Sequence, residues 1–141
     1  MKQYKFNANH YWFVWLIVTT LAYWYVQDTW RPSYRGDNPW IQYILGVAPN
    51  YLPSIGLPAG LYVILYGIRA EDGWWSHWPV EQLPLRAWCI AIGGLLAWEF
   101  AQIFLRGGTF DWHDILWTLL GGLTFWGIWW LTPIRYRIIE A

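Results

Sequence analysis

LRAWCIAIGGLLAWEFAQIFL (residues 85–105) and DILWTLLGGLTFWGIWWL (residues 114–131) are two apolar runs that indicate the fold most clearly. Each run approaches the roughly 20 apolar residues that a helix needs to cross the hydrocarbon core of a bilayer. The polar loop RGGTFDWH (residues 106–113) joins them. Because a short connection makes successive helices antiparallel neighbours, we predict an antiparallel helical hairpin.

Two further apolar runs precede this hairpin, HYWFVWLIVTTLAYWYV (residues 10–26) and YLPSIGLPAGLYVILYGI (residues 51–68). A shorter apolar piece, Trp40 to Ala48, suits an interfacial or re-entrant segment, and residues 28–49 are expected to form the longest external loop. The sequence therefore predicts an all-α polytopic membrane protein with one domain over residues 1–141. Its four transmembrane helices would cover about residues 10–26, 51–68, 85–105 and 114–131, and the third and fourth would form the hairpin.

The composition agrees with a protein that faces lipid. Hydrophobic residues make up 57% of the chain and charged residues 13%, whereas soluble domains carry about 25% charged residues. The 15 Trp and 10 Tyr residues are typical of the headgroup level of a bilayer, or of surfaces that pack on other membrane subunits or pigments. A formal net charge of zero argues against a nucleic-acid partner. We expect membrane lipids as partners, with subunits or pigments as the open alternative.

The Lys and Arg residues predict the orientation. With four spans, the two termini and the loop between spans two and three share one side of the membrane. Cytoplasmic segments carry the excess of Lys and Arg. One side holds six such residues and the other holds three, so both termini are predicted to be cytoplasmic. The six are Lys2, Lys5, Arg69, Arg86, Arg135 and Arg137, and the three are Arg31, Arg35 and Arg106.

The hairpin also predicts which residues share a depth, because residues equally far from its turn lie at the same level. This pairing puts Gly93 and Gly94 level with Gly121 and Gly122, and small residues at one level let two helices approach closely in lipid. It also brings Glu99 to the level of Thr118 or Leu116, and Gln102 to the level of Asp114.

A candidate ligand-binding site follows from that pairing. An ionisable side chain inside a span is costly and marks a functional site by default, and residues three apart share a helix face. The alternatives are structural: Asp111 and Asp114 as helix-capping acids, Arg106 as a loop cation, and Glu99 as a protonated partner of Thr118. The sequence shows no metal-ligand spacing and no cofactor motif. The candidate polar cluster is Glu99, Gln102, Asp114, Thr118, Arg106, Asp111, Asn50 and Ser54.

The segment from Glu99 to Gly122 resembles the signature of the VanZ-like membrane family. The resemblance rests on Glu99-Phe-Ala-Gln102, on the acids at the head of the next helix, and on Thr118 and the glycines after it. Asn50-Tyr-Leu-Pro-Ser54 resembles the family's entry to an earlier helix. The resemblance implies a bacterial cytoplasmic (inner) membrane and an outward-facing polar site, and it supplies no reaction.

Three functions remain open at this point. The first is a non-catalytic VanZ-like protein whose outward-facing polar pocket binds an envelope or lipid-linked molecule. The second is an accessory subunit of a larger photosynthetic or respiratory membrane complex, packed on partner helices, lipids or pigments. The third is a membrane enzyme that uses Glu99 and Asp114 as acid and base.

Overall fold

A computed structural model describes residues 7–70, 77–105, 108 and 110–137. These residues contain helices and no strand, so the predicted all-α fold is confirmed. The long helices are α1 (Ala8–Trp24), α3 (Pro39–Ala70), α4 (Leu83–Gln102) and α5 (Trp112–Leu131). Four short elements accompany them: the π-helix η1 (Tyr25–Trp30), α2 (Arg31–Ser33), the 3-10 helix η3 (Val80–Gln82) and α6 (Ile134–Arg137).

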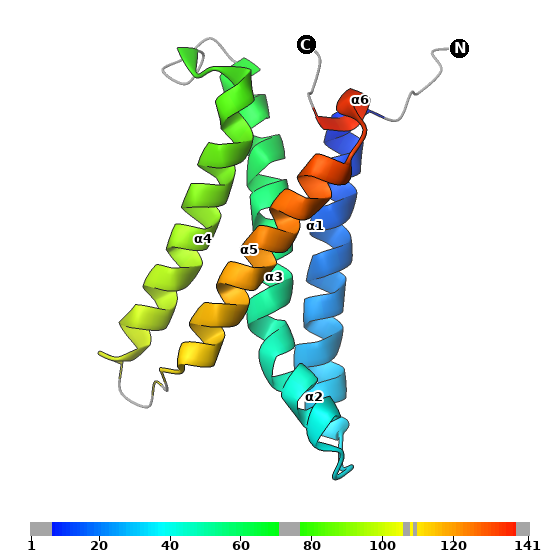
Figure 1. The fold of residues 1–141 in the computed structure, drawn as a ribbon, viewed down its shortest axis with the longest axis vertical. Helices are drawn as coiled ribbons and strands as arrows, with labels where there is room; N and C mark the ends of the chain where they lie inside the picture. The colour runs from blue at the N-terminus through cyan, green and yellow to red at the C-terminus, as the bar shows by residue number, and fades with distance from the viewer. Residues whose placement is uncertain (1–6, 71–76, 106–107, 109, 138–141) are drawn as a thin grey trace.

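The central helix is α3, against which α1, α4 and α5 all pack (Figure 1). Helices α4 and α5 contact each other less than each contacts α3. The start of α1, the 3-10 helix η3 and α6 lie at one end of the bundle, and α2 lies at the other (Figure 1). We call the first end the terminal end and the second the loop end.

The apolar piece from Trp40 to Ala48 is not the separate interfacial segment that its length predicts. It forms the first part of α3, which continues through Pro49, Pro53 and Pro58 without a break. Asn38 caps this early start, since its side-chain oxygen accepts a hydrogen bond from the backbone N–H of Trp40 at 3.0 Å. A proline inside a helix removes one backbone hydrogen bond and bends the axis, and the N-terminal part of α3 is inclined to the rest (Figure 1).

Two helical segments, Pro39–Arg69 and Val80–Gln102, are long and apolar enough to cross a membrane. Helix α4 ends at Gln102 rather than at residue 105. The expected external loop over residues 28–49 is also largely helical, because the π-helix η1 and α2 extend α1 and because α3 begins at Pro39.

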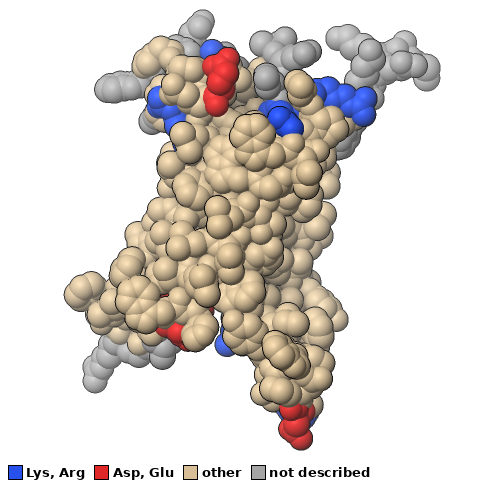
Figure 2. All heavy atoms as spheres, in the orientation of Figure 1, with Lys and Arg blue, Asp and Glu red and all other residues tan. Residues whose placement is uncertain are grey.

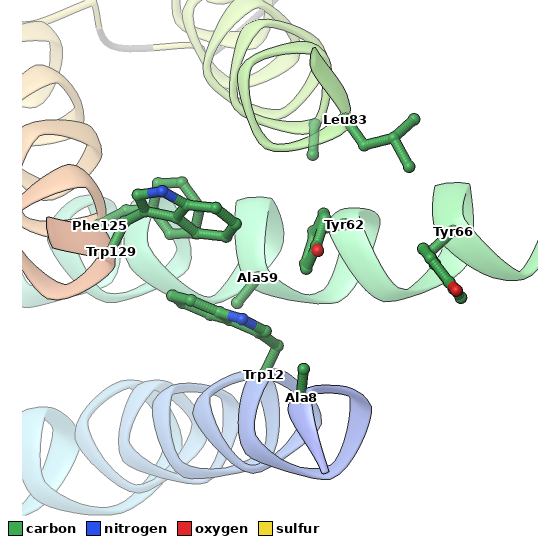
Figure 3. Close-up of a cluster of buried hydrophobic side chains, with 9 residues drawn as sticks. Ala8, Trp12, Ala59, Tyr62, Tyr66, Leu83, Phe125 and Trp129 are labelled. Atoms are coloured by element: carbon green, nitrogen blue, oxygen red, sulfur yellow. The ribbon is translucent and has the colours of Figure 1, made fainter. Parts of the chain in front are cut away.

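The core at the terminal end is a cluster of aromatic rings (Figure 3). Trp12 stacks on Trp129 with ring centroids 5.0 Å apart, and Tyr62 meets the same indole edge-on at 5.3 Å. Backbone carbonyls of α6 accept hydrogen bonds from the polar atoms of these rings. Trp12 Nε1 donates to the carbonyl of Tyr136 at 2.7 Å, and the Tyr62 hydroxyl donates to that of Arg137 at 2.8 Å. The rings therefore hold α1, α3, α5 and α6 together.

The predicted close approach of two glycine pairs is wrong for the pair on α4. A Cβ atom added at Gly93 or Gly94 would meet nothing within 4 Å. The pair on α5 is packed, but each glycine faces a different helix. A Cβ at Gly121 would lie 2.5 Å from the carbonyl oxygen of Tyr51 in α3, and one at Gly122 would lie 2.9 Å from Trp88 Nε1 in α4.

The outer surface between the two ends is apolar. Charged side chains gather at the two ends of the molecule, with a broad uncharged region between them (Figure 2). Many large apolar side chains in the middle of the helices are exposed, among them Leu123 at 61% and Val18 at 52%. A monomeric soluble protein rarely exposes apolar patches larger than a few hundred Å².

Candidate functional site

A polar cavity of about 760 Å³ lies at the loop end of the bundle. Its walls come from η1 and α2, the N-terminal part of α3, the C-terminal end of α4 and the start of α5. In Figure 2, acidic and basic atoms are visible beside the hollow between the two lower projections of the molecule. The charged and amide side chains in the lining are Gln27, Arg31, Gln42, Asn50, Glu99, Gln102, Asp111 and Asp114.

Glu99 and Gln102 form one wall of this cavity. They lie three residues apart on α4, and Gln102 Nε2 donates a hydrogen bond to Glu99 Oε2 at 2.7 Å. The predicted shared helix face is confirmed. Glu99 is only 5% exposed, so Gln102 gives this buried carboxyl group the polar partner that burial requires.

Asp114 lies in the first turn of α5 and lines the same cavity. Its carboxylate interacts with the Asn50 side chain of α3, and it interacts electrostatically with Glu99 and with Arg31. A carboxylate in the first turn also interacts favourably with the helix dipole. Asn50, Glu99 and Asp114 therefore bring three helices to one polar surface.

Asp111 is the N-cap of α5, as the capping alternative holds. Its Oδ1 accepts hydrogen bonds from the backbone N–H of His113 at 2.9 Å and, in one tautomer, from Nδ1 of the same residue at 3.0 Å. The backbone hydrogen bond, followed by the ring hydrogen bond, holds the pKa of Asp111 below its usual value. The side chain also lines the cavity, so it combines a capping role with a place in the candidate site.

Two predicted residues, Ser54 and Thr118, stand apart from this surface. Ser54 is buried, and its hydroxyl donates to the backbone carbonyl of Asn50 at 2.7 Å. Thr118 is 1% exposed, and no hydrogen bond between it and Glu99 is found in the described part of the chain. Neither residue lines the cavity. Arg106 lies outside the described residues.

Among the charged and amide side chains of the lining, sequence reasoning missed Gln42 of α3, and it also missed Gln27 and Arg31. The π-helix η1 and α2 carry them past the end of α1, and Arg31 Nη1 donates to Gln27 Oε1 at 3.3 Å. Their i, i+4 spacing directly after the first span was the available signal, but this segment was expected to be loop. Single-turn π-helices frequently occur at functional sites.

Aromatic hydrogen bonds fix the N-terminal part of α3 over α5 beside the cavity. Trp117 Nε1 donates to the Tyr43 hydroxyl at 3.0 Å, and the hydroxyls of Tyr51 and Thr124 are 2.8 Å apart. These contacts hold the wall that carries Asn50.

The lining offers groups that can interact with both cations and anions. Carboxylates of Glu99, Asp111 and Asp114 can accept hydrogen bonds from a cationic group, and the guanidinium of Arg31 can donate to an anionic one. Within the described residues, no three His, Cys, Asp or Glu side chains are grouped so that they could hold a metal ion. Comparison with known proteins gives no match to a protein-family model, to a curated protein or to a solved structure.

Proposed function

We propose that this chain is a membrane protein whose four long helices all cross the bilayer, and that its cavity binds the polar part of an envelope or lipid-linked molecule without catalysis. One observation carries the proposal. A cavity lined by Arg31, Glu99, Asp111 and Asp114 opens at one end of a bundle whose middle surface is apolar. Ligand sites typically have volumes of about 300–1,000 Å³, and this cavity lies within that range.

Surface exposure and helix length support four crossings. The chain is helical from Ala8 through Trp30, and α5 (Trp112–Leu131) has 20 residues, about the length that a crossing requires. The first segment is rich in Trp and Tyr and α5 is rich in Trp, and the rings of both residue types suit the membrane interface. The exposed apolar side chains between the two ends would face lipid in this arrangement.

The distribution of arginines supports cytoplasmic termini and a cavity in the outer half of the membrane. Arg69, Arg86, Arg135 and Arg137 belong to the terminal end, whereas the loop end carries Arg31 and Arg35 among the described residues. Reporter fusions at each terminus test this orientation. An external C-terminus would contradict it.

The bacterial inner membrane and the relationship to VanZ-like proteins belong to the same proposal. One support is the resemblance of the segment from residue 99 to residue 122 to the signature of that family. The other is a cavity lined by Asn50, Glu99, Gln102, Asp111 and Asp114. Residues that are far apart in the motif thus share one surface.

Purification in mild detergent, followed by mass spectrometry of the molecules that accompany the protein, tests the binding function. The parent and the control Glu81→Gln, at an exposed position of η3 at the other end, should retain one defined polar-headed molecule. Glu99→Gln and Asp114→Asn should lose it. Equal retention by all four proteins would contradict binding at the cavity, and a defined set of protein subunits would favour the accessory-subunit alternative.

A further inference from the structure

A second cavity, of about 290 Å³, lies between α1 and α3. Its lining is largely apolar and includes Leu16, Tyr23, Pro53, Gly56 and Leu57. We call it the apolar groove. Tyr23 precedes the cavity residue Gln27 by four positions, and Pro53 follows the cavity residue Pro49 by four. The groove is therefore about one helical turn deeper in the bundle than the polar cavity.

One face of α3 runs through both cavities. Gly46, Pro49, Pro53 and Gly56 are spaced by three or four residues, and such residues share a helix face. The first two line the polar cavity and the last two line the apolar groove. On the facing segment, the π-helix η1 begins between Tyr23 of the groove and Gln27 of the cavity. The polar cavity and the apolar groove therefore follow one another along the same helix face. A lipid has the same order, with a polar headgroup followed by an apolar chain.

We propose that the two cavities bind a single membrane phospholipid, whose headgroup carries both a primary amine and a phosphate. The headgroup occupies the polar cavity and an acyl chain occupies the apolar groove. This inference rests on the proposed function of the polar cavity, and it names the ligand class.

The charges in the lining select this headgroup. Glu99, Asp111 and Asp114 supply carboxyl groups, and Arg31 supplies one guanidinium. A primary ammonium can donate charge-assisted hydrogen bonds to the carboxylates, while the guanidinium binds the phosphate. A phosphoglycerol headgroup brings an anion without the amine, so the carboxylates of the cavity would have no cationic partner. A choline headgroup has no N–H to donate. Unpaired charges and unmatched polar groups disfavour both of these lipids.

Thermal melting of the purified full chain in detergent tests the headgroup. Phosphatidylethanolamine, phosphatidylglycerol and phosphatidylcholine with the same acyl chains are added separately, and free phosphoethanolamine is added in a fourth arm. A ligand that binds the folded state raises the melting temperature. We expect phosphatidylethanolamine to raise it by several degrees more than either other lipid, and more than phosphoethanolamine. An equal effect of free phosphoethanolamine would overturn the role of the acyl chain.

Variants assign the effect to the two cavities. Asp114→Asn and Arg31→Gln should lose most of the ethanolamine-lipid shift. Leu57→Trp, which fills the apolar groove, should reduce it, whereas Ile64→Trp, an exposed position of α3 outside the groove, should keep it. A full shift in Leu57→Trp would overturn the single-lipid arrangement.

A different pattern separates this inference from the proposed function. If phosphatidylglycerol gives the largest shift and Asp114→Asn abolishes it, the cavity binds a lipid but the amine assignment is wrong. If no lipid shifts the melting temperature, and if no accompanying molecule depends on Glu99 or Asp114, both the inference and the proposed function fail.

Discussion

The two ends of the bundle use polar atoms in opposite ways. At the terminal end, Trp12 and Tyr62 donate to backbone carbonyls of α6, so their polar atoms form hydrogen bonds within the protein. At the loop end, Arg31, Glu99 and Asp114 line a cavity. The first arrangement closes the structure, and the second leaves charged groups beside a space that a ligand can fill.

Irregular backbone is concentrated toward the cavity. The π-helix η1 lies at the loop end, and Pro49 and Pro53 lie inside the N-terminal part of α3. Departures from regular structure are expected at functional sites, where other parts of the fold offset their cost. The aromatic cluster of the terminal end supplies that stability, since large rings bury about 150–250 Å² each.

The largest loss of stability should come from the terminal end. Trp12→Ala removes a fully buried ring that contacts Tyr62, Phe125 and Trp129. We expect the free energy of unfolding to fall by about 3–5 kcal/mol, measured by denaturation in detergent. Trp24→Ala, on the exposed face of the same helix, should change it by less than about 0.5 kcal/mol. Equal losses in the two variants would contradict a special contribution of the aromatic cluster at the terminal end to stability.

A smaller loss should separate the two glycine pairs. Gly121→Leu forces a side chain against the Tyr51 carbonyl and Ser54, and overpacking of this kind costs about 1–3 kcal/mol. Gly94→Leu adds its side chain where a Cβ meets nothing within 4 Å, so the melting temperature should stay close to that of the parent. A marked loss in Gly94→Leu would show that α4 packs differently from the arrangement described.

The glycine comparison shows what spacing in a sequence can predict. Depth along a hairpin follows from counting residues, but the direction in which a residue faces depends on rotation about the helix axis. Gly121 and Gly94 therefore share a predicted level and differ completely in their surroundings. The three-residue spacing of Glu99 and Gln102 fixes a shared face directly, and for this reason that pair was predictable.

The early start of α3 and the place of Arg31 in the cavity wall could not be predicted from the sequence, because packing overrides local preferences at both positions. The apolar piece from Trp40 to Ala48 looked separate because it is short, and a proline such as Pro49 after it normally ends or bends a helix. Packing of α3 against three other helices maintains the helix despite this preference. In the same way, η1 continues α1 where the polar residues Gln27 and Asp28 indicated a loop.

Substitutions in the cavity should affect binding more than stability. Glu99→Gln keeps a side chain that can accept the hydrogen bond from Gln102, so unfolding free energy should change by less than about 1 kcal/mol. Glu99→Leu leaves the Gln102 amide without this acceptor and should cost somewhat more. Both variants should lose the ligand-dependent rise in melting temperature. Retention of the full rise would mean that Glu99 has a structural role only.

The smallest effect should be the pH dependence contributed by Asp111, at the boundary between capping and binding. Because its pKa is lowered in the folded state, the folded carboxylate adds stability that is fully present above the ordinary Asp pKa of about 3.9. That stability is lost as the pH falls through the lower folded value. The side chain is exposed, and solvent screens its interactions, so the loss should be small.

Melting curves of the parent and of Asp111→Asn between about pH 6 and pH 3 measure this contribution. The two melting temperatures should differ by a constant amount near neutral pH and converge as the pH falls. His113→Gln retains the backbone N–H, which is the main cause of the lowered pKa, and removes the ring. Its melting curves should therefore keep most of the parent's acid sensitivity. If His113→Gln instead behaves like Asp111→Asn, the ring is the principal partner of Asp111, and the capping hydrogen bond contributes little to the stability of α5.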